Sequence, residues 1–325
     1  MRTGRLTMLA VGTLLSSFNP AAAQTHSAQP IIAVVPFPAG GPLDTLARVL
    51  GERLRESLDQ PVVIEHVSGT SGTIGVGRVA RAAPDGHTLC FGFLGTHVLN
   101  GAIYPLTYDV LKDFEPVALL PAIPLVIGAK QAVPANNLRE LIAWLKVNAT
   151  RATVATPSFG SPSHIMGIAL QDLVGARLQF VHYRGGGPAL QDLVGGHVDV
   201  LINQPAIFLP HAQDGKIKIY AVLAKNRLLK APAIPTADEE GVPGFYMSVW
   251  HGLWAPKDTP KAVIARLNDA VVDALADAAI RKRLEELGYE IPGHEQQAPA
   301  ALRMLQEAEI KKWWPIIKAT NLKPE

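Results

Sequence analysis

Residues 31–48 combine a fully apolar run, a loop rich in proline and glycine, and the start of an amphipathic helix. The apolar run, residues 31–35, is mostly β-branched and shows no polar alternation, which is typical of a parallel strand covered on both faces. Pro36 and Pro38 then remove donors from the strand ladder, and Gly40 and Gly41 allow the chain to turn. The pattern therefore predicts a buried strand that ends in a tight loop.

The helix that follows has apolar residues at three- and four-residue spacing, at Leu43, Leu46, Ala47, Leu50 and Leu54. The amides of a first helical turn have no partner within the helix, and the dipole makes that end positive. Amides of the glycine loop point to the same place. This stretch therefore predicts an anion site.

The same order of strand, loop and helix recurs along the chain. Strands are expected at 62–65, 88–93, 153–156, 178–181, 198–202 and 217–223, and helices at 73–83, 138–147, 164–174 and 188–194. Such alternation predicts an α/β protein with mostly parallel sheets and helices on both faces.

Two further apolar segments do not fit this alternation. Residues 114–128 form two short runs separated by Pro121 and Pro124, and residues 249–256 read VWHGLWAP. Both are interpreted as strands that cross between two lobes. Lobe 1 is expected to contain residues 24–127 and 250–325, and lobe 2 residues 128–249. After the second crossing, Asp258 or Thr259 is expected to cap a helix with Pro260 in its first turn.

The first 23 residues have the features of a cleavable secretory signal. Arg2 and Arg5 precede an apolar stretch at 6–18, and small residues at 21–23 form an A-x-A site. The apolar stretch is too short for a membrane anchor, and no later segment is long and apolar enough to span a membrane. The mature protein is therefore expected to be exported.

Charge and cysteine content exclude several classes of function. Without Arg2 and Arg5 the 30 basic residues fall to 28, which balances the 28 acidic ones. A neutral chain without a basic run lacks the footprint of a nucleic-acid binder. Cys90 has no disulfide partner and lies in an apolar run, which favours a core position. The ten histidines show no metal-binding spacing, so no metal or cofactor is expected.

A second glycine loop, YRGGGPALQD at residues 183–192, repeats the features of the first. Gly185, Gly186 and Gly187 expose consecutive amides, and Pro188 suits a first helical turn. This loop could lie across a cleft from the first loop and bind the same ligand, or it could be a tight turn that binds no ligand. Arg184 could clamp a carboxylate or lie in solvent.

The segment TPSFGSPSHIMG, residues 156–167, places serines and a histidine before a helix. Ser161 or Ser163 is expected to cap that helix, and the other hydroxyls could donate to a ligand. A catalytic pair of Ser163 and His164 is disfavoured because adjacent residues at a helix start diverge and no G-x-S-x-G elbow is present.

A loose dinucleotide fingerprint, Gly75-x-Gly77-x-x-Ala80, is also discounted. The preceding strand ends about ten residues upstream, whereas the fingerprint requires its glycines in the turn directly after a strand.

Seven motifs in order, PFPAGGPLDTLAR, APDGHTL, GTH, LKDFEPV, GSPSH, YRGGGPALQDLVGGHVD and WHGLWAPKDTP, resemble the Bug family of periplasmic solute-binding proteins. The resemblance implies a two-lobed periplasmic-binding-protein (Venus-flytrap) fold that captures a small carboxylate for the membrane permease of a tripartite tricarboxylate transporter. It also implies the positions that line the site: Phe37, Ala39, Gly40, Gly41, Leu43, Asp44, Ser161, Ser163, His164, Tyr183, Gly185, Gly186, Gly187, Ala189 and Asn203.

Two departures from the family pattern concern the solute. Residues 66–75 read HVSGTSGTIG where many relatives have an N-R-P-G-A-G-G-N type of loop, and Asn203 stands where relatives commonly have an acid. A carboxylate there would suit an ammonium group, so Asn203 favours a dicarboxylate or aromatic acid over an amino acid. Two alternatives use the same chain differently: a periplasmic sensor partner of a signalling receptor, and a periplasmic hydrolase.

Overall fold

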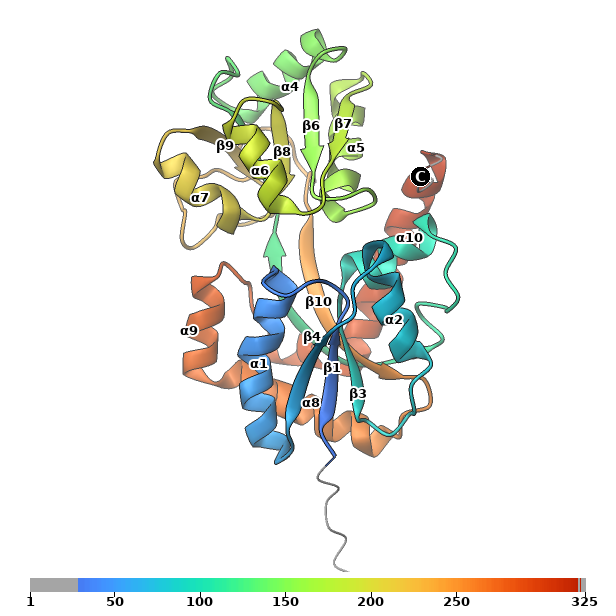
Figure 1. Cartoon of the computed structure of the whole chain (residues 1–325). Coiled ribbons are helices and arrows are strands. Elements are labelled where there is room, and N and C mark those ends of the chain that lie inside the picture. Colours follow the sequence, from blue (N-terminus) through green and yellow to red (C-terminus); the bar gives the residue numbers. More distant parts are fainter. Residues whose placement is uncertain (1–28, 321, 323–325) are drawn as a thin grey trace, which may run out of the picture.

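The computed structural model describes residues 29–320 and residue 322, and shows two five-stranded sheets, one above the other (Figure 1). The predicted signal at 1–23 lies outside the described residues. No helix among the described residues is long and apolar enough to cross a membrane.

The first sheet has the order β2-β1-β3-β10-β4. Its strands are β1 (Ile31–Val35), β2 (Val62–His66), β3 (Thr88–Phe93), β4 (Phe114–Pro124) and β10 (Ser248–Pro256). β1 pairs in parallel with β2 and β3, whereas β10 is antiparallel to both β3 and β4.

The second sheet has the order β7-β6-β8-β5-β9. Its strands are β5 (Val126–Lys130), β6 (Thr153–Thr156), β7 (Gln179–His182), β8 (Val200–Asn203) and β9 (Ile217–Val222). β6 is parallel to β7 and β8, and β5 is antiparallel to β8 and β9.

Both sheets are mixed, but in each of them four of the five strands run in the same direction, as predicted for mostly parallel sheets. In each sheet the one strand of opposite direction, β10 or β5, is the strand that arrives from the other lobe. A strand that crosses from the opposite lobe enters its sheet from the facing end, so it runs against the strands that begin at the outer end.

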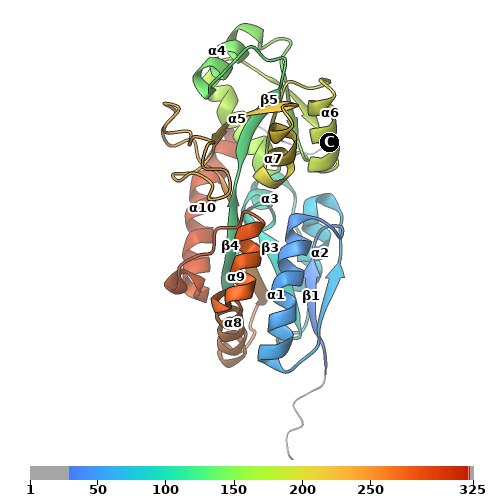
Figure 2. The same ribbon diagram turned by 90° about the vertical axis from the view of Figure 1, so that its left-hand side faces the viewer.

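Helices cover both faces of each sheet. They are α1 (Pro42–Leu58), α2 (Thr73–Ala80), α3 (Asn100–Ile103), α4 (Leu138–Asn148), α5 (Pro162–Val174), α6 (Gly186–Val194), α7 (Pro205–Gln213), α8 (Lys261–Ala276), α9 (Ala278–Glu286) and α10 (Pro299–Ala319). Three single turns complete the set: Thr70–Gly72, Gly95–Leu99 and His294–Gln297. Figure 2 shows α10 along one face of the first sheet and α1, α8 and α9 on the other.

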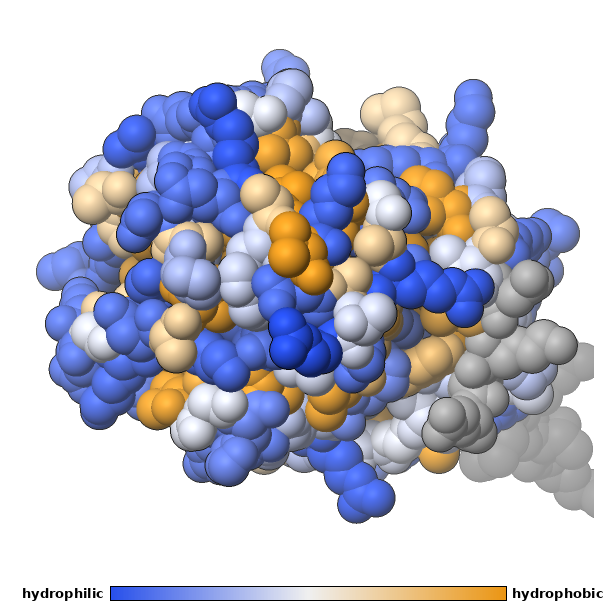
Figure 3. All heavy atoms as spheres, turned by 90° about the horizontal axis from the view of Figure 1, so that it is seen from above, coloured by the Kyte–Doolittle hydropathy of each residue, from blue (hydrophilic) through white to orange (hydrophobic). Residues whose placement is uncertain are grey.

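The alternation of side chains along β1 explains these two layers. Ile31, Ala33 and Val35 pack in the cluster that contains α1 and α8, whereas Val34 packs in the cluster that contains α2 and α10. The prediction of a strand covered on both faces is confirmed. Seen from above, hydrophilic side chains cover most of the end of the second lobe, with apolar ones scattered between them (Figure 3).

Three chain segments meet where the sheets join. The Leu125 amide donates to the Met247 carbonyl, the Met247 amide donates to Leu223, and the Leu223 amide donates to Leu125, at 2.8 to 3.0 Å. The first sheet ends at Pro124 and the second begins at Val126, so this ring of hydrogen bonds lies at the crossing point.

The start of α8 differs from the expectation. The N-cap is Pro260 rather than Asp258 or Thr259, and the Thr259 hydroxyl donates to the Pro256 carbonyl at 2.7 Å. Asp258 has a φ of 65° and stands two residues before this N-cap.

Candidate functional site

The carboxyl ends of the parallel strands of each sheet point toward the other sheet, so the loops singled out in the sequence face one another (Figure 1). The lobes also touch there. A Cβ added at Gly160, in the loop after β6, would lie 2.8 Å from Ile103 Cδ1 in the first lobe.

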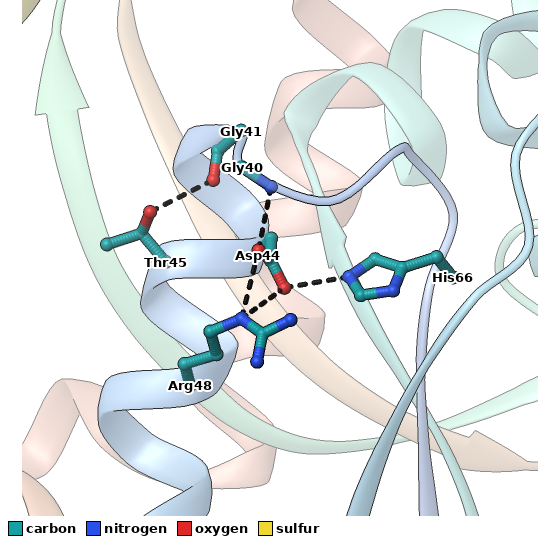
Figure 4. Close-up of polar contacts among 6 residues, drawn as sticks. All are labelled: Gly40, Gly41, Asp44, Thr45, Arg48 and His66. Atoms are coloured by element: carbon teal, nitrogen blue, oxygen red, sulfur yellow. Dashed lines mark hydrogen bonds and ion pairs between the residues drawn. The ribbon is translucent and has the colours of Figure 1, made fainter.

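The first glycine loop is held by the carboxylate of Asp44, which is 4% exposed in the first turn of α1 (Figure 4). Asp44 Oδ2 accepts hydrogen bonds from the Gly40 amide at 2.8 Å and from Arg48 Nε at 3.1 Å. Its Oδ1 lies 2.7 Å from His66 Nε2, at the end of β2. Asp44 therefore ties the loop after β1 to the loop after β2.

This network changes the interpretation of the first loop. The Gly40 amide, which was expected to bind an anion, donates to Asp44 instead. Pro42 has no amide hydrogen, so the donors that remain at this helix end are the amides of Leu43 and Asp44. The sequence could not show that one of the amides assigned to the anion site is already used.

The two glycines of this loop also differ in backbone conformation. Gly40 has a φ of 85°, a backbone conformation in which a residue with a side chain would be strained. Gly41 has an ordinary φ of −80° and space for a Cβ.

The other predicted residues of this loop differ in how far they are buried. Ala39 is exposed, Leu43 is buried in the core, and Phe37 packs edge-on against Phe93 at 5.5 Å.

Asp44 is expected to make the free energy of unfolding depend on pH in the acidic range. Burial alone would raise the pKa of Asp44, but the hydrogen bonds from Gly40, His66 and Arg48 outweigh it and lower that pKa from 3.8 to about 2. A lowered folded-state pKa stabilises the protein above the unfolded value, and this contribution is lost as the pH falls from about 4 to about 2. We expect Asp44→Asn to lose about 2 kcal/mol of pH-dependent stability over that range, measured by urea unfolding. Glu52→Gln, on the exposed face of the same helix, is the control, and a pH profile of Asp44→Asn parallel to wild type would contradict the prediction.

The second glycine loop leads into α6. Gly185 has a φ of 122°, and its amide donates to the Pro157 carbonyl at 2.8 Å. Pro188 carries no amide hydrogen, so Gly186 and Gly187 supply the open amides of the first turn. The start of α6 lies at the end of the second lobe that faces the first lobe (Figure 1).

Two other predicted residues of this loop are engaged within the lobe. The Tyr183 hydroxyl donates to Asp192 Oδ2 at 2.6 Å, and burial together with this carboxylate raises the pKa of Tyr183 to about 12. Ala189 is fully buried in the second-lobe core. Both residues therefore fix the shape of the loop by packing and hydrogen bonding. The side chain of Arg184 is exposed beside them.

Asn203, the last residue of β8, presents an unpartnered donor beside this loop. The residue is 8% exposed, and its Oδ1 accepts from the Gln204 amide at 2.8 Å. Its Nδ2 is buried and has no acceptor among the described residues. A Cβ added at Gly186 would lie 2.6 Å from that nitrogen, so the donor lies at the N-terminus of α6. A buried donor without an acceptor costs free energy unless a ligand atom pairs with it.

The helix α5 brings a third set of donors. Ser161 caps it by accepting from the His164 amide at 3.3 Å, as the sequence predicted for one of the two serines. The hydroxyl of Ser163, which is buried, makes no hydrogen bond within the described residues. The first-turn amide of Ser163 is also without an intrahelical partner.

The protonation state of His164 follows from its contacts. The Gly160 amide donates to His164 Nδ1 at 3.0 Å, so this nitrogen carries no hydrogen. Burial, and to a lesser extent the neighbouring His182, lower the pKa of His164 to about 3. The ring is therefore neutral at physiological pH, and its Nε2 carries a hydrogen that can be donated.

Sequence reasoning did not identify two parts of this site. His66 was seen only as the start of a candidate loop, although its position directly after a strand was a usable signal. His182 was missed as well; it lies 4.5 Å from His164 between ring centroids and 2.7 Å from the Thr156 hydroxyl.

The glycines of the discounted dinucleotide fingerprint lie inside α2 and serve close packing. A Cβ at Gly75 would come within 2.5 Å of the Val67 carbonyl, and one at Gly77 within 3.3 Å of the Tyr108 ring. Within residues 29–320 and 322, no group of three or more histidine, cysteine or acidic side chains is arranged to hold a metal. The facing loops thus offer neutral donors from three helix N-termini, which suits a small carboxylate.

Comparison with known proteins gives consistent results. A family model described as the tripartite tricarboxylate transporter family receptor (TctC) matches residues 46–322. Protein BugT of Bordetella pertussis is 34% identical over 307 residues, which is 94% of this chain and 93% of BugT.

Two solved structures are also similar to this chain in sequence and in fold. MatC from Rhodopseudomonas palustris, solved with bound malate, is 41% identical with a TM-score of 0.80, covering 89% of this chain and 99% of MatC. Another R. palustris protein, solved with adipate, is 30% identical with a TM-score of 0.82, covering 91% of this chain and 99% of its own.

Proposed function

This chain belongs to the tripartite tricarboxylate transporter receptor family, and from that premise we propose that it captures a small dicarboxylate between its lobes. It is a periplasmic solute-binding protein with a two-lobed fold. Within that role, we infer that the acid has no α-ammonium group and that the loaded protein delivers it to membrane permease subunits.

One observation carries the choice of solute class. The Asn203 carbonyl oxygen already accepts from the Gln204 amide, and the unpartnered group of this side chain is the Nδ2 donor. A donor pairs with a carboxylate oxygen and not with an ammonium. The relatives solved with malate and adipate hold dicarboxylates, which is consistent with this assignment.

Neutral donors are sufficient for the expected affinity. Micromolar binding corresponds to about −8 kcal/mol. Each charge-assisted hydrogen bond contributes roughly 1.5 to 3 kcal/mol, so three or four of them can supply this free energy after ordering costs. The amides of Leu43, Gly186 and Gly187 and the side chain of Asn203 provide that number.

The arrangement at Ser163 argues against a hydrolase. A serine nucleophile needs a base within hydrogen-bond reach, and the Ser163 hydroxyl makes no such bond. His164 Nδ1 is occupied by the Gly160 amide. We therefore propose binding without turnover, and ester hydrolysis that disappears in Ser163→Ala would contradict this.

Calorimetry with matched acids tests the solute class. We expect succinate, malate or adipate to bind with micromolar affinity and aspartate and glutamate to bind at least about tenfold more weakly, a difference of about 1.4 kcal/mol. Native mass spectrometry of the purified protein should also reveal a co-purified acid. Tight binding of aspartate with no binding of succinate or malate would refute the assignment.

The proposed partner and export route have separate tests. Pull-down from membranes should recover permease subunits, whereas recovery of a histidine kinase alone would favour a sensor role. The proposed cleavage after residue 23 predicts a mature protein that begins at Gln24, which N-terminal sequencing of the periplasmic form can check.

A further inference from the structure

A pocket of about 420 Å³ lies on the side of the crossing strands that is covered by α10. We call it the hinge pocket. Its walls come from β4, from the start of β10, from residues 290–296 and from α10. Figure 2 shows α10 running beside β4 up to the level where the two lobes join. The volume is within the range of sites that hold small organic molecules.

Two residues that line this pocket each carry a buried polar atom without a partner among the described residues. These atoms are the Ser248 hydroxyl oxygen and Trp250 Nε1. Trp250 is 5% exposed, and the two residues are two apart on β10, so their side chains lie on the same face of the strand. Trp250 Nε1 can only donate, so it requires an acceptor such as a carbonyl oxygen. Leaving such a donor unpaired is costly, which indicates a site built around a bound group.

The charged residues of the hinge pocket determine the sign of its occupant. Glu290 and Glu309 line it together with Lys312. Lys312 Nζ lies over the Trp313 ring at 4.4 Å, and Glu309 accepts from Trp313 Nε1 at 2.7 Å. Two acids and one base leave a net negative charge, which disfavours a carboxylate and favours an ammonium.

Glu290 is held firmly in this wall. Its backbone exchanges two hydrogen bonds with Ala122 of β4, at 2.9 and 2.7 Å. Its carboxylate makes no ion pair or hydrogen bond within the described residues and is exposed at the pocket rim. It is therefore available to a cationic ligand group.

We propose that the hinge pocket is a second ligand site, separate from the facing glycine loops, that takes a small amine carrying a carbonyl group and an apolar side chain. The carbonyl oxygen accepts from Trp250 Nε1 and from the Ser248 hydroxyl. The ammonium pairs with Glu290, and the apolar group packs against Leu119 and Leu305. An amino-acid amide has this combination of groups. Tyr246 and Met247 also line the pocket, so an occupant contacts the segment that crosses between the lobes.

Leucinamide is the probe, and N-acetylleucine, which has the same side chain and the opposite charge, is its matched control. We expect saturable millimolar binding of leucinamide, followed by ligand-observed NMR and by tryptophan fluorescence, and no saturable binding of N-acetylleucine. Glu290→Gln, Ser248→Ala and Trp250→Phe should each weaken leucinamide binding by about fivefold or more, because each removes one polar partner. Glu307→Gln, an exposed change of the same kind on α10, should leave it unchanged.

Three results would overturn the proposal: no saturable binding of leucinamide, equal binding of N-acetylleucine, or unchanged affinity in the pocket variants. If Trp250→Phe does not fold, as judged by circular dichroism, Glu290→Gln and Ser248→Ala decide the outcome alone.

Discussion

Replacing Asn203 with aspartate is expected to weaken dicarboxylate binding by roughly 100-fold or more, about 3 kcal/mol. The substitution keeps the size and shape of the side chain. It exchanges the unpartnered Nδ2 donor at the N-terminus of α6 for a carboxylate oxygen. A solute carboxylate would then lose a hydrogen bond and meet a like charge in a buried place. Isothermal titration with succinate and malate measures the loss.

The same variant makes a second, opposite prediction. A carboxylate at position 203 can accept from an ammonium, so Asn203→Asp should shift the preference of the protein toward aspartate and glutamate relative to succinate. Gln213→Glu adds one negative charge at the exposed end of α7 in the same lobe and should change neither affinity. Unaltered succinate binding by Asn203→Asp would show that position 203 does not contact the solute.

The second large effect is expected from Gly186→Ala. An added Cβ would lie 2.6 Å from Asn203 Nδ2 and 3.4 Å from Ile207 Cδ1, so the Asn203 side chain must move. Its Oδ1 is held by the Gln204 amide, and the displaced part is therefore the donor. We expect affinity for the dicarboxylate to fall by roughly tenfold or more, about 1.4 kcal/mol, in calorimetry.

The stability of this variant separates a local effect from general damage. Alanine favours a helix over glycine by up to about 1 kcal/mol, so the free energy of unfolding should change little while binding falls. In an Asn203→Ala background, Gly186→Ala should add almost no further loss of affinity, because its effect acts through the Asn203 amide. Additive losses in the double variant would show that Gly186 acts through another route.

Each of the two glycine loops uses one of its backbone amides for a hydrogen bond within the protein. In the first loop the Gly40 amide donates a hydrogen bond to the buried carboxylate of Asp44. In the second loop the Gly185 amide donates to the Pro157 carbonyl. In both cases a predicted donor is part of the scaffold, and the donors left open are those of the following helical turn. We therefore expect changes that disturb the starts of α1 and α6 to affect binding more than changes at Ala39 or Gly41.

Local patterns in the sequence determined the elements of this protein and their order. Strands such as β1 and β3 and helices such as α4 and α5 begin and end within a few residues of the predicted limits. Apolar spacing, glycine and proline act over one or two turns of chain, so they can be interpreted without knowing the fold. The two lobes and the opposed glycine loops followed from the repetition of these patterns.

The tertiary structure decided what each donor does. Asp44 and His66 are 22 residues apart in the sequence, yet their side chains meet at 2.7 Å. The direction of β5 and β10, the free donor of Asn203 beside Gly186, and the unpaired atoms of Ser248 and Trp250 also depend on distant chain segments. The sequence by itself determined which groups could bind an acid, because glycine loops and helix starts are specified by residues that are neighbours in the chain. Only the fold decided which of those groups remain free, because hydrogen-bond partners are assigned by contacts between residues far apart in the chain.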